Sequence, residues 1–281
     1  MHVLFFPVPI ILSAIAGDSL PEVSLSDSVA PQGAILRLTV EGGGMPDTVT
    51  GRFNGKEVPF VRGSDGFYAL LGIDMEARPG KLPVEVRLGS GPGAALIRRQ
   101  VRVKDGRFPV QRINLPPEKV FPDTAAESRI RREDAYRDSC WSHWENTHHW
   151  EGSFIPPLQG EMKRFGNRRI LNGAPRSPHT GVDITAETGE PVVAPAGGRV
   201  IATGDFFFSG GSIYIDHGFG LISMYFHLSR LDVQQGDTVR QGQVIGAVGA
   251  TGRVSGAHLH WGVRYRNARI NPRSLLDLKL E

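Results

Sequence analysis

Five residues in three short motifs of the C-terminal third have side chains suited to metal chemistry. They are His179 and Asp183 in HTGVD, His227 in MYFHLS, and His258 and His260 in GAHLHWG. Imidazole and carboxylate groups serve as ligands and proton carriers in hydrolytic metal sites. The motifs therefore predict a metal centre with catalytic partners beside it.

The spacing within two of these motifs agrees with a shared site. Side chains alternate between the faces of a strand, so His258 and His260 point the same way, as do His179 and Asp183 if their segment is extended. Two imidazoles and one carboxylate form a ligand set that suits Zn²⁺ and leaves a fourth position open for water. Zinc acidifies bound water and polarises a carbonyl, so the pattern indicates hydrolysis.

Each motif alone also has a structural interpretation. A single HxxxD is common by chance, and His227 alone would be a core or surface histidine. His217, in the turn-like IDHGFG, is interpreted as structural. A second candidate metal or sugar site is WSHWENTHHW, residues 141–150, although most such clusters are packing at a domain junction.

The order and context of the motifs add a resemblance. The runs RFGNRRILNGAPRSPHTGVDI, YIDHGFGLISMYFHLS and VGATGRVSGAHLHWGV resemble the lysostaphin-like or LytM-type zinc metallopeptidases of the M23 family. The resemblance covers about residues 151–273 and includes all three family signatures. It implies one zinc ion per chain on His179, Asp183 and His260, with His227 and His258 as catalytic histidines. Which of these two is the general base stays open, and we favour His258.

The C-terminal region, residues 151–281, is expected to form a compact antiparallel sheet or partial barrel. Glycine-rich turns separate the expected strands, which are residues 191–193, 198–202, 212–216, 221–227, 243–249 and 258–263. The run from Phe206 to Phe208 before a flexible turn is either a loop beside the substrate groove or part of a buried strand.

An all-β pattern also marks residues 17–113. Leu36, Leu38 and Val40 alternate with polar residues, which is typical of half-buried strands. Turn dipeptides such as Asn54-Gly55 suit hairpins. We expect an immunoglobulin-like β-sandwich that binds a substrate or partner, covers the groove, or acts as a spacer.

A helical connector is expected over residues 114–150. Thr124 and Glu127 have the spacing of a capping box, and the helix is expected to reach about Trp144. Tyr136, Cys140 and Trp144 would then share one face. The lone cysteine excludes an internal disulfide framework.

Residues 1–16 resemble a secretory signal peptide, with an apolar run and a small-residue cleavage site before Gly17. A membrane anchor is the alternative interpretation, but the run is shorter than the ~20 apolar residues that span a bilayer, so we favour cleavage and expect no stable membrane span after it. The protein is therefore expected to be exported to the periplasm or cell envelope.

Composition agrees with an exported β protein. There are 35 glycines among 281 residues, well above the ~7% average, which favours a turn-rich β structure. The formal net charge is only +3, and no dense basic patch with interleaved aromatics is present, which argues against nucleic acid as a partner.

The expected function is that of an exported zinc metalloendopeptidase acting on peptidoglycan cross-links or stem peptides, a substrate class implied by the resemblance. Two other functional classes share features with this sequence. VQQGDTVRQGQVIGAVGATG resembles biotinyl and lipoyl carrier domains, but no lysine lies between Lys163 and Lys279 to carry the cofactor. A non-catalytic or latent LytM-like scaffold, which would bind cell wall and activate other hydrolases, remains the alternative.

Overall fold

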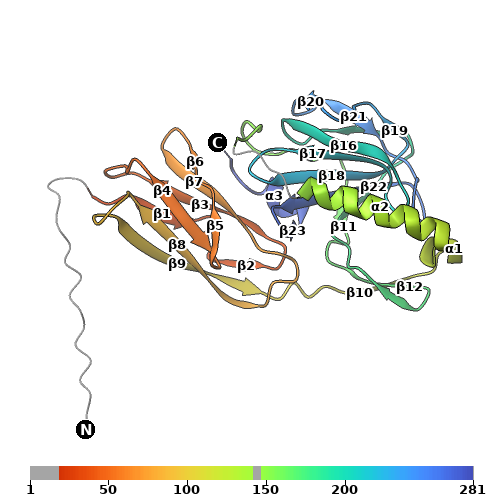
Figure 1. Cartoon of the computed structure of the whole chain (residues 1–281), viewed down its shortest axis with the longest axis horizontal. Helices are drawn as coiled ribbons and strands as arrows, with labels where there is room; N and C mark the ends of the chain where they lie inside the picture. Colours follow the sequence, from red (N-terminus) through yellow and green to blue (C-terminus); the bar gives the residue numbers. More distant parts are fainter. Residues whose placement is uncertain (1–18, 142–146, 281) are drawn as a thin grey trace, which may run out of the picture.

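The computed structural model describes residues 19–141 and 147–280 (Figure 1). Strands account for 46% and helices for 10% of the structure, which confirms the expectation of a mainly β protein. The expected signal peptide and Trp144 lie outside the described residues. Within the described part of the chain, we find no helix with the length and apolar character of a membrane span.

Two sheets face each other in the N-terminal part. The first has the order β1 (Glu22–Leu25), β3 (Ile35–Glu41), β7 (Gly66–Gly72), β6 (Val61–Arg62). The second has the order β2 (Val29–Pro31), β9 (Ala95–Lys104), β8 (Gly80–Leu88), β4 (Val49–Phe53), β5 (Lys56–Val58). The alternating residues Leu38 and Val40 pack with Val84 and Val86 in one buried core. This arrangement is a sandwich, and its likeness to the immunoglobulin fold stays a prediction.

The connector contains α1 (Pro117–Val120) and α2 (Thr124–Trp141), and the structure adds β10 (Val110–Ile113) to it, because this strand falls in the range expected for the sandwich but pairs with a strand of the C-terminal part. The expected capping box is wrong, because α2 already begins at Thr124 and Asp123 occupies the cap. The Ala126 amide donates to Oδ1 of Asp123 at 2.8 Å. The negative charge of this carboxylate also interacts favourably with the positive, N-terminal end of the helix dipole. The last described residue of the helix, Trp141, is buried against the neighbouring sheet.

The C-terminal part is built on an eight-stranded antiparallel sheet, across which α2 lies in Figure 1. Its order is β11 (Met162–Lys163), β14 (Gly181–Thr185), β22 (His258–Tyr265), β18 (Leu221–Leu228), β17 (Gly210–Asp216), β16 (Gly198–Phe206), β20 (Thr238–Val239), with β23 (Ala268–Ile270) beside β22. Helix α3 (Pro272–Leu276) follows β23. The expected strands of this region are confirmed within a few residues.

Two smaller sheets complete this part. One has the order β15 (Pro191–Val193), β21 (Val244–Ala247), β19 (Arg230–Leu231). The other joins the connector to the C-terminal part in the order β10, β12 (Arg168–Leu171), β13 (Ala174–Arg176). Strand β10 pairs with β12 in parallel, and β12 pairs with β13 antiparallel.

One hydrophobic core crosses from the N-terminal sandwich into the C-terminal part. Ile35 and Leu70 of the sandwich belong to the same buried cluster as Trp261 of β22. Polar contacts reinforce this junction: the Asn271 amide donates to the Gly33 carbonyl at 2.7 Å. A Cβ at Gly33 would lie 2.4 Å from the Phe165 ring, and its φ of +84° is also unfavourable for other residues. The close contact therefore requires glycine.

Asp74 forms the most extensive polar link across the junction, and its replacement is expected to destabilise the fold. Its carboxylate accepts from the backbone amide and the guanidinium of Arg269 at distances of 2.6 to 2.9 Å. Burial alone would raise the pKa of Asp74, but the hydrogen bonds from Arg269 outweigh it and lower the pKa. We expect Asp74→Asn to reduce the free energy of unfolding by ~1–3 kcal/mol at pH 7.

Urea unfolding at several pH values measures this effect. Because the folded-state pKa of Asp74 is lowered, its contribution is present above the unfolded-state pKa and is lost as the pH falls through the folded-state value. The two proteins should therefore converge in acid. The control is Asp47→Asn, at an exposed position. Equal stability of wild type and Asp74→Asn at pH 7 would contradict the assigned link.

Candidate active site

Neighbouring strands place Asp183 and His260 opposite each other. They are paired residues of β14 and β22. Gly181, at the start of β14, allows this approach, because a Cβ there would lie 2.6 Å from Nε2 of His260. His179 precedes β14 and is held by the 164–167 turn: its amide donates to the Asn167 carbonyl at 2.9 Å, and its Nδ1 lies 2.7 Å from the Arg164 carbonyl.

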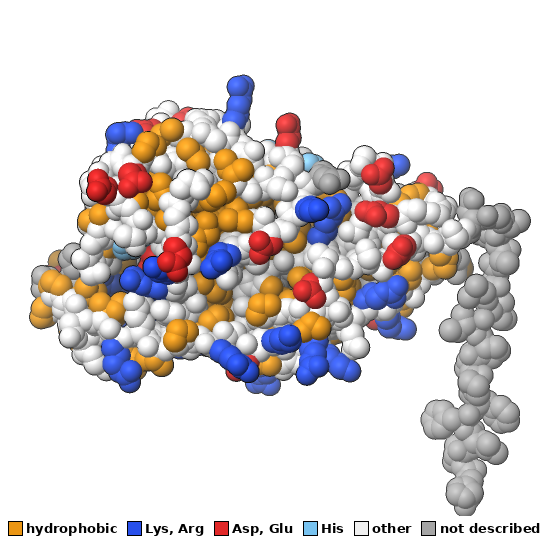
Figure 2. Space-filling model, turned by 180° about the vertical axis from the view of Figure 1, so that it is seen from behind, with side chains coloured by type: hydrophobic (Ala, Val, Ile, Leu, Met, Phe, Trp, Pro, Cys, Tyr) orange, Lys and Arg blue, Asp and Glu red, His pale blue; other side chains and the backbone are white. Residues whose placement is uncertain are grey.

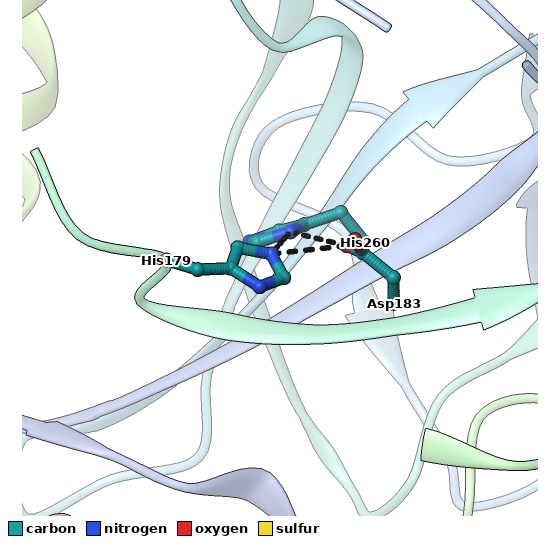
Figure 3. A group of neighbouring side chains, drawn as sticks. All are labelled: His179, Asp183 and His260. Carbon is teal, nitrogen blue, oxygen red and sulfur yellow. Dashed lines mark hydrogen bonds and ion pairs between the residues drawn. The ribbon is translucent and has the colours of Figure 1, made fainter. Parts of the chain in front are cut away.

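The three side chains converge on one point (Figure 3). Nε2 of His179 lies 2.8 Å from Nδ1 of His260 and 3.0 Å from Oδ1 of Asp183. Nδ1 of His260 lies 3.1 Å from the same oxygen. All three residues are buried, with His179 fully inaccessible. Two ring nitrogens and a carboxylate oxygen therefore share a small, buried volume.

The chemistry of this cluster fits a divalent cation. Because the Arg164 carbonyl can only accept, Nδ1 of His179 donates to it and Nε2 carries a lone pair. That lone pair faces the Asp183 oxygen at 3.0 Å, an arrangement that is repulsive unless a cation or proton lies between them. Zinc is bound by this set of donors, and three protein ligands leave one coordination position open.

The ionisation states of the cluster agree with metal binding. Burial lowers the pKa of His179 and lowers that of His260 to about 4, so both imidazoles are neutral at pH 7. Burial alone would raise the pKa of Asp183, but hydrogen bonds from the adjacent imidazole rings, when a proton lies between ring and carboxylate, lower it well below its usual range. Neutral imidazoles and an ionised carboxylate are the forms that bind metal ions.

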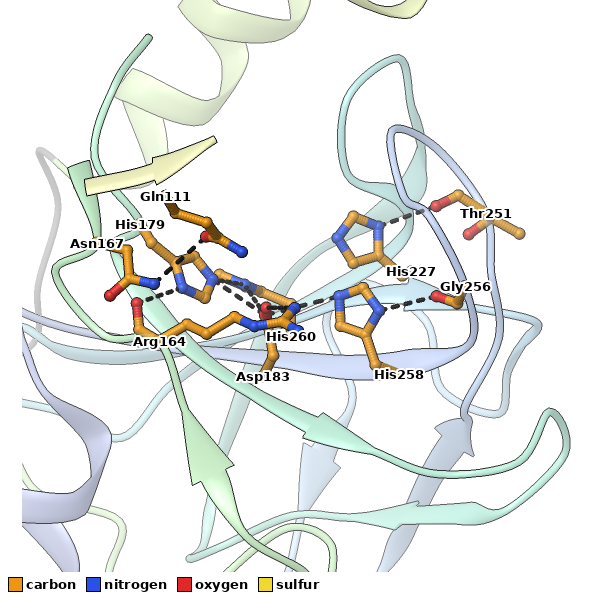
Figure 4. A network of polar contacts seen from close by, with 10 residues as sticks. All are labelled: Gln111, Arg164, Asn167, His179, Asp183, His227, Thr251, Gly256, His258 and His260. Atoms are coloured by element: carbon orange, nitrogen blue, oxygen red, sulfur yellow. Dashed lines mark hydrogen bonds and ion pairs between the residues drawn. The ribbon is translucent and has the colours of Figure 1, made fainter. Parts of the chain in front are cut away.

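The other two predicted histidines lie beside this cluster, on the side away from His179 (Figure 4). The rings of His227 and His258 are 4.9 Å apart, and Nε2 of His258 is 3.6 Å from Oδ1 of Asp183. Nδ1 of His227 lies 2.9 Å from the Thr251 carbonyl, and Nδ1 of His258 lies 2.9 Å from the Gly256 carbonyl. Both rings are thus oriented by backbone carbonyls and carry a lone pair on Nε2.

Burial also keeps His227 neutral. Burial and, to a smaller extent, the nearby imidazoles of His260 and His258 lower the pKa of His227 to about 3. The backbone of His227 has φ of +67°, which is uncommon for a residue with a side chain, and its amide donates to the Ser209 carbonyl at 2.8 Å. The local fold holds this residue in a costly conformation at the end of β18.

The tautomers of these histidines can be measured directly. In metal-free protein at pH 7, we expect His227 and His258 to carry their proton on Nδ1, because a carbonyl accepts there. Nitrogen-15 NMR of histidine-labelled protein distinguishes the two tautomers. His217 is the internal control, since its Nδ1 also faces a carbonyl, that of Gly197, at 2.7 Å. Nε2–H signals from His227 or His258 would contradict the geometry described above.

A cleft of about 790 Å³ opens next to the cluster. Its lining includes Asp183, His227, His258 and His260, residues of β10, β12 and β13, and residues of α2. Arg164 also lines it and places its guanidinium 3.3 Å from Oδ2 of Asp183. No described residue before Gln111 lines the cleft, so in this structure the sandwich does not cover the groove and the connector forms part of its wall.

The remaining sequence candidates lie elsewhere or have structural partners. His217 is fully buried, with Nδ1 at 2.7 Å from the Gly197 carbonyl and Nε2 at 2.7 Å from Ser223 Oγ, as expected for a structural histidine. His148, in the second candidate cluster, packs against Trp150 and Phe219. Residues 142–146 of that cluster lie outside the described residues.

Sequence reasoning missed the groups that orient the histidines. These are the carbonyls of Arg164, Thr251 and Gly256, which no side-chain motif reveals. It also missed Arg164 as the partner of Asp183. Phe206 is the last residue of β16 and packs against a hydrophobic cluster, whereas Phe208 lies between β16 and β17 and lines the cleft, so each interpretation of the Phe206–Phe208 run holds for part of it.

Comparison with known proteins identifies similar chains. The model of peptidase family M23 matches residues 177–272, a segment that contains all five candidate residues. The crystal structure of a Pseudomonas aeruginosa protein named for peptidase M23 is 30% identical, with a TM-score of 0.66, and the match covers 89% of this chain and 95% of that one.

Two curated relatives match over a shorter stretch. Peptidoglycan DD-endopeptidase ShyC of Vibrio cholerae is 40% identical over 97 residues, which are 34% of this chain and 22% of that protein. DD-carboxypeptidase/endopeptidase Mpg of Neisseria meningitidis is 42% identical over 97 residues, which are again 34% of this chain and 22% of that protein. The matched segment therefore spans about a fifth of the length of these relatives.

Proposed function

Because the chain belongs to peptidase family M23, we propose that it is a zinc metalloendopeptidase that hydrolyses peptide bonds in the cross-links or stem peptides of peptidoglycan. One observation carries the proposal: His179, Asp183 and His260 converge within 3.1 Å of one another beside two histidines that line a cleft. The names of the curated relatives support the substrate class.

His179, Asp183 and His260 would hold the zinc ion. When bound there, zinc would act as a Lewis acid on the scissile carbonyl and lower the pKa of water at the open position. The protein orients the ligands: the Arg164 carbonyl fixes the ring of His179, and the Arg164 guanidinium donates to Oδ2 of Asp183. Carbonyl partners that fix the ring of a ligating histidine commonly strengthen metal binding.

His258 is proposed as the general base. Its Nε2 carries a lone pair and is 3.6 Å from Asp183 Oδ1, close to the ligand cluster, so it can accept a proton from attacking water. The resulting imidazolium can then donate that proton to the leaving amine. His227, held neutral by burial, offers a second acceptor next to it and helps to orient the water.

Digestion of purified cross-linked peptidoglycan tests the proposal. The zinc-supplied protein and the Asp183→Ala variant would be incubated with the polymer, and the released muropeptides identified by mass spectrometry. Products made by the wild type alone, with a peptide bond hydrolysed, would support the endopeptidase and identify the bond. Identical product patterns with and without the wild-type protein would contradict it and favour a non-catalytic scaffold.

Peptidoglycan as substrate places the protein outside the cytoplasmic membrane, so we also propose export to the cell envelope. The apolar run and small-residue site within residues 1–16 support this proposal. Intact-mass analysis of protein purified from the periplasmic fraction should give a chain that starts at Gly17. A full-length chain confined to the cytoplasm would contradict export.

A further inference from the structure

Three arginines gather on the cleft wall next to the ligand cluster. Arg169 and Arg176 are directly opposite each other on β12 and β13, and both line the cleft. Like charges at directly paired positions destabilise a sheet. Gln111 of β10 is paired with Arg169 on its other side and lines the cleft as well. A polar row therefore crosses this small sheet.

Arg253 adds a third guanidinium from the loop before β22. It lines the same cleft, and its guanidinium carbon lies 4.0 Å from the centroid of the Phe208 ring. Burial and the charges of Arg169 and Arg176 lower the pKa of Arg253 to about 10, so the group stays charged at neutral pH. Stacking on an aromatic ring restricts a guanidinium and leaves its edge free for hydrogen bonds.

No carboxylate of the described residues contacts Arg169, Arg176 or Arg253. Nε of Arg169 is buried without a hydrogen-bond partner within residues 19–141 and 147–280. Arg176 donates to the Val120 carbonyl at 3.0 Å, which leaves its charge uncompensated. Three guanidinium groups that lack a carboxylate partner among the described residues indicate a binding site for an anion.

The acidic residues of the cleft are engaged with other groups. Asp183 contacts its imidazole neighbours and Arg164. On α2, Glu127 is 3.7 Å from Arg131, and Asp134 is 2.9 Å from Arg137. Asp183 acts on Arg169 through its charge, but none of these three carboxylates forms a hydrogen bond or ion pair with the arginines of the wall.

This charge is local. On the face of the molecule shown in Figure 2, basic and acidic side chains are interspersed and do not form one large patch of a single sign. The formal net charge of the whole chain is only +3.

We propose that Arg169, Arg176 and Arg253 form a subsite that binds a free carboxylate of the peptide substrate next to the scissile amide. The inference rests on the proposed function and deepens it by defining which peptides the cleft prefers. Guanidinium groups bind carboxylates through paired, charge-assisted hydrogen bonds. Arg169 and Arg253 line the same cleft as His258 and His260, so a carboxylate held there would lie in the cleft that receives the reacting bond.

Two synthetic peptides that share one scissile amide test the subsite. One carries a free carboxylate on the residue next to that amide, and the other carries a carboxamide at the same position. The ratio of their kcat/KM values is measured with the zinc-supplied full-length protein, with Arg169→Gln and Arg253→Gln, and with Arg112→Gln. Arg112 is an exposed residue of β10 outside the cleft lining, so its variant is a matched control.

We expect the wild type and Arg112→Gln to prefer the carboxylate peptide by about 10- to 100-fold, and each cleft variant to lose about 10-fold or more of that preference. A ratio near one for the wild type, or an unchanged ratio in both cleft variants, would overturn the subsite while hydrolysis itself still supported the proposed function. Hydrolysis of neither peptide, nor of peptidoglycan, would overturn both. Zinc content and thermal unfolding of each variant show whether the ligand cluster and fold are intact.

Discussion

Asp183→Ala is expected to lose both zinc and hydrolytic activity. The substitution removes the only carboxylate of the described ligand cluster and leaves two neutral imidazoles, which bind zinc more weakly. It also leaves the Arg164 guanidinium without its acidic partner beside the site. Because the metal supplies several kcal/mol of transition-state stabilisation, kcat/KM should fall by at least ~10³-fold.

Metal analysis and peptidoglycan hydrolysis on the same preparation check this prediction. The wild type should bind one zinc per chain, and Asp183→Ala should bind far less at equal total zinc. Asp232→Ala is the control, since Asp232 pairs with Arg230 on the surface, where an ion pair contributes little. Full activity of Asp183→Ala would exclude this cluster as the catalytic centre.

His258→Ala is expected to show a different defect, in which zinc remains but catalysis fails. Nε2 of His258 lies 3.6 Å from Oδ1 of Asp183, farther than the 2.8 to 3.1 Å that separate the three ligand atoms from one another. Removal of His258 should therefore leave the three ligands in place. Loss of a general base lowers kcat by about 10²- to 10⁴-fold. The measurement is kcat on a defined peptide, with zinc content determined in parallel.

Two comparisons make this result specific. His227→Ala should also retain zinc, and a smaller decrease in kcat than that of His258→Ala would support His258 as the base. His148→Ala should keep both zinc and activity, because His148 packs with Trp150 and Phe219 away from the cluster. If His258→Ala turned over peptide at the wild-type rate, the assignment of the base would be wrong.

The sequence was sufficient to predict which residues meet at the site. His258 and His260 share a face because they are two residues apart in a strand, and both approach Asp183 in the structure. The expectation for His179 and Asp183 was only partly right. Strand β14 starts at Gly181, so His179 reaches Asp183 from the preceding segment and is positioned by the Arg164 carbonyl.

Long-range pairing explains most of what the sequence did not predict. The parallel pairing of β10 with β12 joins segments far apart in the chain, and residues 168–176 have no clear alternation of apolar and polar side chains. Arg169 and Arg176 face each other across the local β12–β13 hairpin, for which Asn172-Gly173 is a turn signal, whereas Gln111 reaches this sheet only through the long-range β10–β12 pairing. Local periodicity contains no information on such contacts.

The helix start illustrates a more local limit. Thr124 and Glu127 fit the spacing of a capping box, yet Asp123 one residue earlier is an equally good cap. Since helix boundaries are uncertain by one or two residues in any assignment, the pattern alone does not decide between them. The buried Trp141 likewise follows from packing against Tyr214, which no local pattern predicts.

Anomalous X-ray diffraction from crystals of the zinc-supplied protein, collected above and below the zinc absorption edge, shows directly whether zinc binds to His179, Asp183 and His260. We expect one strong peak per chain, bonded to Nε2 of His179, a carboxylate oxygen of Asp183 and Nδ1 of His260, with His258 close by. A peak on His148 or His149 instead, or no peak at this cluster with zinc in excess, would contradict the assignment of the metal centre.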